Sequence, residues 1–173
     1  MREVQLPLTK ETIASLHAYE RVLLSGPLLV GRDQVHKYLV DRLDSKAVLP
    51  VSIQGETIYY MGPSATPEGM VIGSCGPTTS ARMDPFTPRL MEAGLVATIG
   101  KGPRSKAVVE AIIATGGIYF VAFGGCGALY AETVQSKEVL ACEEFGPEAL
   151  LRLEIVRFPA VVGIDSRGNS VFH

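Results

Sequence analysis

Short apolar runs along the chain alternate with stretches in which apolar residues recur every three or four positions. The apolar runs are "RVLLSGPLLV" (21–30), "ETIYYM" (56–61), "MVIGSC" (70–75), "LVATIG" (95–100) and "IYFVAF" (118–123). Runs of this length, bounded by Gly or Pro, are typical of buried strands. The Ser25-Gly26 pair interrupts the first run and predicts a hairpin or a sharp corner between two strands.

Helical spacing appears directly after the first run. Val35, Leu39 and Leu43 lie one helical turn apart, and Asp33 is placed to act as the N-cap of this helix. The segment 105–117 predicts a second helix, with Val108, Ile112 and Ile113 facing inward and a glycine stop.

The remaining segments are weaker in pattern but follow the same alternation. We predict strands at 3–8, 137–146 and in the tail around a turn at 166–169, and helices from about 9, at 126–134 and within 79–94. The last of these is broken by two prolines and closed by Gly94.

Strands that alternate with helices indicate an α/β fold. The hairpin-like segments at the two ends of the chain argue against a purely parallel sheet. We therefore expect a mixed, barrel-like sheet with helices packed outside it. The chain has 173 residues and no linker-like tract, so we expect one domain over 1–173.

Composition narrows the classes of function. Hydrophobic residues make up 47% and charged residues 20%, which is ordinary for a globular protein. The net charge of −2 offers no basic face for nucleic acid. No run approaches the roughly 18–20 apolar residues of a membrane span. The start, "MREVQLPLTKE", lacks the order of a signal peptide, so we expect a cytoplasmic protein.

The three cysteines are Cys75, Cys126 and Cys142, and no CxxC pair occurs. A zinc site or a disulfide framework is therefore disfavoured. Three thiolates could hold an iron–sulfur cluster, and three cysteines are present here. The alternative is that all three are small buried residues in apolar runs, and we favour it because free cysteine is commonly buried.

Three predicted strand-to-helix junctions share a cationic character. The junctions carry Arg32; Thr78, Thr79 and Arg82; and Lys101 with Arg104 behind it. In α/β sheets, ligands collect beyond the carboxyl ends of strands, and arginine pairs suit carboxylates. These groups therefore predict a site for a small dianion. The alternative is that the hydroxyls cap a helix, Arg82 pairs with Asp84 and Lys101 is solvated.

His36 falls one helical turn after Arg32, which makes it a further candidate for this site. The three histidines show no metal-binding spacing, and we favour a structural role for His36.

The junction residues resemble those of a known family. "GPTTSARMDPFTPRLMEAGLVATIGKG" (76–102) is similar to the signature of the class I fumarate hydratase C-terminal domain. That domain also occurs as a separate β subunit in two-component fumarases and L(+)-tartrate dehydratases. "LLSGPLLVGRDQVHKYL" (23–39) and "VLACEEFGPEALLRLEIVRFPAVVGIDSRGN" (139–169) resemble two further family segments, so the likeness covers nearly the whole chain.

The resemblance implies a swivelling β/β/α fold and a hydro-lyase subunit. It implies that Arg32 and Arg82 grip substrate carboxylates and that Lys101 contacts substrate. Thr78 and Thr79 would be the catalytic hydroxyls, with Thr78 as the base for the C3 proton. His36 and Asp84 are further candidates near this set.

The resemblance also implies partners and a cofactor. This chain would bind no metal, and a [4Fe-4S] cluster would belong to a partner α subunit, which we expect in a heterotetramer. The substrate would be a C4 dicarboxylate: fumarate or malate, with tartrate as the alternative. A non-catalytic carboxylate-binding or assembly module is the alternative of another class. We expect the chain to be inactive without its α subunit and able to form homo-oligomers when isolated.

Overall fold

A seven-stranded sheet forms the centre of the computed structural model, which describes residues 1–173. The strand order is β1-β2-β3-β4-β5-β7-β6, and β7 also pairs with β2. The strands are β1 (Arg2–Gln5), β2 (Arg21–Val30), β3 (Thr57–Tyr59), β4 (Ala97–Gly100), β5 (Ile118–Val121), β6 (Val134–Ala141) and β7 (Leu150–Ile164). The extra β2–β7 pairing closes the sheet into a barrel of β2, β3, β4, β5 and β7.

The barrel contains both parallel and antiparallel strand pairs. The strands β2, β3, β4 and β5 run parallel to one another, whereas β7 is antiparallel to both β2 and β5. The carboxyl ends of the parallel strands therefore meet at one rim. Because β7 begins opposite Val30, the chain that leads into β7 reaches the same rim.

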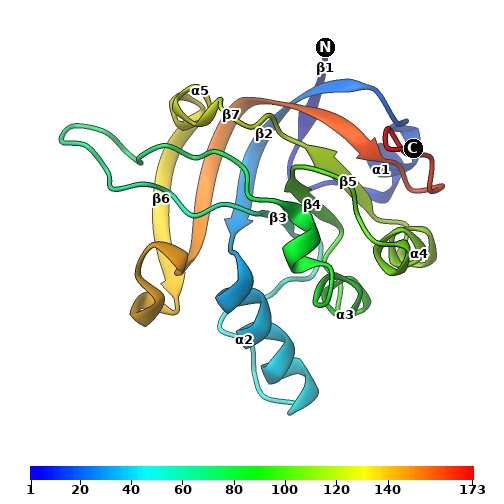
Figure 1. The fold of residues 1–173 in the computed structure, drawn as a ribbon, viewed down its shortest axis with the longest axis horizontal. Coiled ribbons are helices and arrows are strands. Elements are labelled where there is room, and N and C mark those ends of the chain that lie inside the picture. The colour runs from blue at the N-terminus through cyan, green and yellow to red at the C-terminus, as the bar shows by residue number, and fades with distance from the viewer.

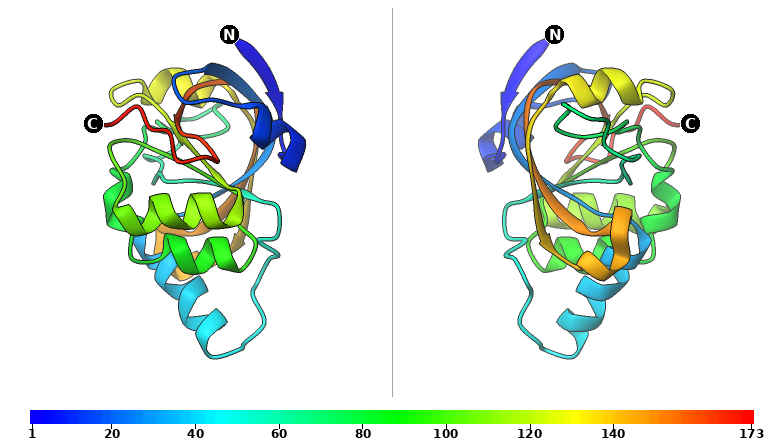
Figure 2. Two further views of the ribbon diagram at one scale, coloured as in Figure 1. Left: turned by 90° about the vertical axis from the view of Figure 1, so that its right-hand side faces the viewer. Right: turned by 90° about the vertical axis from the view of Figure 1, so that its left-hand side faces the viewer.

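The helices cover the outside of this barrel (Figures 1 and 2). The α-helices are α1 (Lys10–Ser15), α2 (Asp33–Asp44), α3 (Thr87–Glu92), α4 (Lys106–Thr115) and α5 (Gly127–Glu132), and the 3₁₀ helices are η1 (Ser80–Met83) and η2 (Glu143–Glu148). The mixed barrel-like sheet with outer helices is the predicted fold class, which is confirmed. No helix combines the length and apolar character needed to cross a bilayer.

The core has two main parts that lie on opposite faces of the sheet. Leu28 and Val30 of β2 belong to a cluster of 28 buried residues. Leu29, between them, belongs to a second cluster of 11 residues that also holds Val35 and Leu39 of α2. This alternation is the two-residue period of a strand buried on both faces, and it explains why β2 reads as a continuous apolar run.

The first apolar run does not form a hairpin or a corner. It is one ten-residue strand, β2, with a register shift between Leu24 and Gly26. Gly26 has φ +124°, and a Cβ there would lie 2.5 Å from the carbonyl oxygen of Leu6. The glycine marks a bulge in the pairing of β2 with β7, at a place where the segment after β1 also comes close, and a bulge and a turn share the same sequence signal.

The predicted strand at 70–75 is also wrong. Residues 61–79 form no strand or helix and extend from the body past β6 (Figure 1); we call 62–77 the arm. The arm is tied to α5 by the Cys75 N–H, which donates to the Gly127 carbonyl at 3.1 Å. Ile72 and Cys75 are buried in the larger core cluster, whereas Met70 and Val71 are exposed, so this apolar run packs on the core without joining the sheet.

Two finer predictions about helices need correction. The N-cap of α2 is Arg32, and Asp33 is the first helical residue, with no capping hydrogen bond from the Arg32 side chain. In α4, Val108 and Ile112 are buried, but Ile113 is half exposed and so does not face the core. Both errors are shifts of one position, which leave the elements in place.

Candidate active site

The candidate residues lie at the rim formed by the carboxyl ends of the parallel strands. Arg32 follows β2, Lys101 follows β4, and Gly124 follows β5. The segment 78–80 fills the place between β3 and β4. The Thr78 N–H donates to the Tyr60 carbonyl at 2.8 Å. The strand ends therefore deliver the predicted groups to one edge.

Thr79 lies directly beside Lys101. The two residues form a parallel β-bridge, and the Ser80 N–H donates to the Lys101 carbonyl at 2.9 Å. Thr78 is half buried and Thr79 is exposed, whereas Ser80 is fully buried. Of the three successive hydroxyls, that of Ser80 is engaged, at 2.9 Å from the Tyr119 hydroxyl. Neither threonine hydroxyl makes a hydrogen bond within the chain, which distinguishes both from Ser80.

Arg32 is oriented from two sides. Its Nε donates to Glu148 Oε1 at 3.2 Å, and its guanidinium lies on Gly62, where a Cβ would come within 2.9 Å of Cζ. Gln34 donates to the other oxygen of Glu148 at 2.9 Å. Glu148 thus engages Nε alone, and the two terminal nitrogens of Arg32 are left for a carboxylate fork.

Arg82 is held by a different carboxylate from the one the sequence suggested. Its Nε and Nη2 donate to the two oxygens of Asp33, at 3.2 and 2.8 Å. The pairing with Asp84 that we considered is therefore wrong. The side chains of Arg82 and Asp33 are 53% and 33% exposed, so water screens the pair strongly. This contact also joins the start of α2 to η1.

Lys101 differs from both arginines because it pairs with no carboxylate. Its side chain lies along the loop after β5, where a Cβ built at Gly124 would be 3.7 Å from Nζ. The lysine therefore brings an uncompensated positive charge to the rim beside Thr79.

His36 lies beneath Arg32 and does not reach the rim surface. Its Nδ1 is 2.6 Å from the Arg32 carbonyl, which can only accept, so Nδ1 carries the proton. Complete burial is the main cause that lowers the pKa of His36 to about 4, so the ring is neutral. Nε2 is buried without a partner. The hydrogen bond to Arg32 therefore joins His36 to the N-cap of α2.

A layer of buried polar groups supports the rim, and Arg104 is its centre. The Arg104 side chain is 0% exposed. Its Nε donates to Asp84 at 2.7 Å and its Nη1 to Thr98 at 3.0 Å. Its Nη2 donates to the Tyr60 hydroxyl at 3.1 Å and to Thr87 at 2.8 Å. Four of its five N–H donors are engaged within the protein, and its complete burial keeps the guanidinium away from a ligand at the rim.

Asp84 belongs to that buried layer and not to the surface of the rim. One oxygen accepts from Arg104, and the other accepts from the Ser105 N–H at 2.7 Å. Asp84 therefore joins the end of η1 to the start of α4. The sequence placed Arg104 among the cationic groups of the third junction but did not show that it is buried, because "KGPR" reads as an exposed polar loop and nothing local marks its partner twenty positions earlier.

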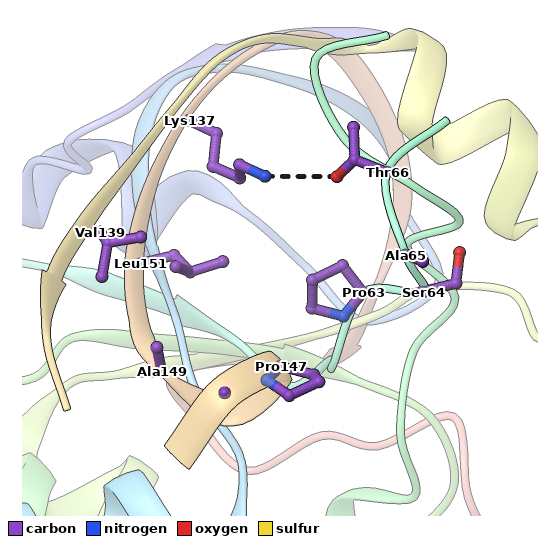
Figure 3. A pocket seen from close by; sticks show the side chains of 10 residues that line it. Pro63, Ser64, Ala65, Thr66, Lys137, Val139, Pro147, Ala149 and Leu151 are labelled. Atoms are coloured by element: carbon purple, nitrogen blue, oxygen red, sulfur yellow. Dashed lines mark hydrogen bonds between the residues drawn. The ribbon is translucent and has the colours of Figure 1, made fainter. Parts of the chain in front are cut away.

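The rim is an open surface. None of the four cavities found in the structure is lined by Arg32, Thr78, Arg82 or Lys101. A cavity of about 230 Å³ adjoins it, between the arm, β6 and η2 (Figure 3). There, Lys137 of β6 donates to Thr66 of the arm at 3.3 Å.

The cysteines are free and scattered over three elements of structure. Cys75 and Cys142 are buried, and Cys126 is half buried. No group of three or more His, Cys, Asp or Glu side chains is arranged to hold a metal ion. The thiols of this chain therefore do not fit a cluster that needs three of them together.

The fold and the rim define a class of protein: a closed mixed α/β barrel that collects cations and free hydroxyls at the carboxyl ends of its parallel strands. A family model described as "Fumarase C-terminus" matches residues 1–173. The chain belongs to the fumarase C-terminal family, and the resemblance predicted from the sequence is confirmed.

Two kinds of relative share this similarity. The class I aerobic fumarate hydratase of Escherichia coli strain K12 is 39% identical over 168 residues, which are 94% of this chain and 31% of that protein. Fumarate hydratase 2 of Leishmania major is 38% identical over 88% of this chain and 27% of its own. The chain thus spans about a third of these relatives. A putative L(+)-tartrate dehydratase subunit beta of Methanocaldococcus jannaschii is 34% identical, over 95% of this chain and 88% of that protein.

Proposed function

We propose that this chain is the β subunit of a two-component class I hydro-lyase that hydrates fumarate to L-malate reversibly. The observation that carries the proposal is the meeting of Arg32, Thr78, Thr79, Arg82 and Lys101 at one rim, joined by the bridge between Thr79 and Lys101. The family membership supports the same chemistry, since the relatives are named as hydratases and as a dehydratase subunit.

Recognition of a C4 dicarboxylate falls to the cations. The terminal nitrogens of Arg32 are unoccupied, so they can hold a carboxylate end-on while Glu148 fixes the side chain through Nε. Arg82 is held by Asp33, but an exposed ion pair contributes only about 0–1 kcal/mol. A substrate carboxylate can therefore displace Asp33. Lys101 supplies further positive charge without losing a partner.

Proton transfer falls to Thr78, with Thr79 next to it. A free hydroxyl is a very weak base, so it needs cations nearby and little water to stabilise its deprotonated form. Lys101, whose backbone is bridged to Thr79, and Arg82, three residues after Thr79, would supply the charge. Exclusion of water requires a cover, because the rim is open in this chain.

The cover in this proposal is an α subunit. The fumarate hydratase relatives carry about two thirds of their length outside the matched region, and the dehydratase relative is named as one subunit. We propose that the α subunit closes the rim, carries the [4Fe-4S] cluster and assembles with this chain as a heterotetramer. That cluster would act as a Lewis acid on the substrate. A cytoplasmic location remains a prediction.

Reconstitution tests this function. The chain is combined with a cluster-bearing α subunit under anaerobic conditions, and the turnover of L-malate and of L(+)-tartrate is measured for the complex and for each subunit. We expect the complex to interconvert malate and fumarate and the metal-free chain to be inactive. Appreciable turnover by the isolated chain, or none by a complex with an intact cluster, would contradict the proposal.

L(+)-tartrate dehydratase is the second candidate, because the relative that matches over most of its own length has that name. One hydroxyl separates the two substrates, so the same assay decides: the larger kcat/KM identifies the substrate. A non-catalytic carboxylate-binding module is the alternative of another class. It predicts that the complex binds diacids but turns over none of them.

A further inference from the structure

One buried hydroxyl lies beneath the rim and belongs to none of the groups assigned so far. Tyr119 of β5 is 0% exposed. Its hydroxyl donates to the Gly102 carbonyl at 2.8 Å and lies 2.9 Å from Ser80 Oγ. A phenol has a single hydrogen, and a carbonyl can only accept. Tyr119 therefore donates to Gly102 and accepts from Ser80.

These two partners adjoin the groups that would carry the chemistry. Ser80 follows Thr79 in the chain, and Gly102 follows Lys101. The Tyr119 hydroxyl thus accepts a hydrogen bond from the threonine segment (78–80) and donates one to the lysine loop (101–102). The backbone hydrogen bond from Ser80 to Lys101 joins the same two segments from above.

The surroundings of Ser80 are shaped for this contact. A Cβ at Gly100 would lie 2.0 Å from Ser80 Oγ, so a side chain at the end of β4 would expel the serine hydroxyl. The absence of that side chain lets Ser80 point into the barrel wall toward Tyr119.

The Tyr119 ring itself is fixed by its neighbours. The Arg104 guanidinium lies 4.8 Å from the ring centroid, and the Phe172 ring stacks at 6.4 Å. A Cβ at Gly163 would come within 3.2 Å of the Tyr119 ring, so β7 also packs closely on it. Burial raises the pKa of Tyr119, which keeps the hydroxyl protonated and able to donate.

We propose that Tyr119 is a positioning residue for the hydro-lyase reaction, which sets the placement of Thr78 and Thr79 relative to Lys101 through Ser80 and Gly102. The proposal rests on the proposed function, and Tyr119 itself touches no substrate. Catalytic groups lose rate steeply when they are misplaced, and a shift of about 1 Å can cost on the order of a hundredfold.

The chain offers a matched control for a purely structural role. Tyr60 is also fully buried and also lies against Arg104, at 5.2 Å from its ring centroid. The Tyr60 hydroxyl donates to Thr87, because the Thr87 hydroxyl already donates to the Met83 carbonyl. Tyr60→Phe therefore removes a comparable buried hydroxyl whose partners are Thr87 and Arg104, and not Ser80 or Gly102.

The first measurement is steady-state kinetics of Tyr119→Phe and Tyr60→Phe in the reconstituted complex. We expect Tyr119→Phe to lower kcat about tenfold or more, with KM within about twofold, because binding groups remain while the base is misplaced. Tyr60→Phe should keep kcat within about twofold and melt at a similar temperature to Tyr119→Phe. A kcat for Tyr119→Phe within about twofold of wild type, or equal losses in both variants, would overturn the proposal.

The second measurement needs no activity, so it separates this proposal from the proposed function. Hydrogen exchange of the Ser80 amide, which donates to Lys101, reports how firmly the two segments are joined. In the full chain, Tyr119→Phe should exchange this amide about tenfold faster than wild type, and Tyr60→Phe should not. Unchanged exchange in Tyr119→Phe would overturn the proposal even if wild-type complex proves inactive.

Discussion

Two arginine–aspartate ion pairs in this protein have nearly equal nitrogen–oxygen distances, but their exposure to solvent differs sharply. Arg82 and Asp33 approach to 2.8 Å at the rim, with side chains 53% and 33% exposed. Arg104 and Asp84 approach to 2.7 Å in the layer below, with side chains 0% and 11% exposed. The first guanidinium can exchange its carboxylate for a ligand, whereas the second cannot.

The comparison shows that exposure decides what a charged residue can do, even where the local contact is the same. Water screens the upper pair and keeps it weak. The lower pair is surrounded by protein, so each charge depends on its partner. The candidate rim, with its exchangeable ion pair, thus lies on a buried layer whose charges are already paired. The predictions below test this division.

The largest effect is expected from breaking the buried pair. Asp84→Asn leaves the Arg104 charge uncompensated in the interior, and it should lower the free energy of unfolding by about 3–5 kcal/mol. The matched variant at the rim, Asp33→Asn, should cost less than about 1 kcal/mol. Urea denaturation of both variants measures the difference. Equal losses would show that the two pairs do not differ as described.

Removal of the upper arginine should act on activity. In the reconstituted complex, Arg82→Ala should lower kcat/KM. The loss should correspond to about 2–5 kcal/mol of transition-state binding, as expected when a charged hydrogen-bond partner is removed. Arg89→Ala is the control, because Arg89 makes a similar exposed pair with Asp44 away from the rim. Near-normal kinetics for Arg82→Ala would remove it from the site.

The buried layer should also make stability depend on pH. The folded-state pKa of His36 is lowered from 6.5 to about 4, so the unfolded chain binds a proton that the folded chain refuses between these values. The contribution of His36 to the free energy of unfolding is therefore fully present above pH 6.5. As the pH falls from 6.5 toward 4, the free energy of unfolding decreases by up to about 3 kcal/mol.

Unfolding in urea at pH 7 and pH 4.5 measures this loss. His36→Gln should flatten the dependence on pH, while the exposed His17→Gln should keep that of wild type. The same slope in wild type and His36→Gln would mean that other groups cause it.

The smallest effect is expected for the stability of Arg82→Ala. Its exposed pair with Asp33 contributes little to folding, so the free energy of unfolding should change by less than about 1 kcal/mol. Thermal unfolding of the isolated chain measures it. A loss of more than about 2 kcal/mol would mean that Arg82 is structural and that its kinetic effect is indirect.

The sequence predicted the rim better than the layer beneath it. Arg32 and Lys101 follow apolar runs that are strands, and this position is visible in a single sequence. The reason for placing Thr78 beside them was wrong, since 70–75 is no strand, and Thr78 reaches the rim through the hydrogen bond of its N–H to the Tyr60 carbonyl. Arg104 and Tyr119 are defined by partners on other elements, and neither has a local pattern. Glu148 is also supplied from far along the chain, since its contact with Arg32 depends on where β7 begins.

The fold was predictable to the level of its class but not of its closure. Apolar periodicity identified most elements, because burial on one or both faces is written in neighbouring residues. It failed at Gly26, where a bulge resembles a turn, and at 70–75, where Ile72 and Cys75 enter the core from a segment that is not a strand. The pairing of β7 with both β2 and β5 depends on contacts between distant segments, which no local pattern encodes.

The double pairing of β7 has a consequence for biosynthesis. Arg21 of β2 finds its partner Val161 only after β7 has left the ribosome. Until then, β2 and β5 present open edges that can join other chains. Until β7 pairs with both, a nascent chain therefore exposes unpaired strand edges that chaperones can protect, and the last step of folding closes the barrel beneath the candidate rim.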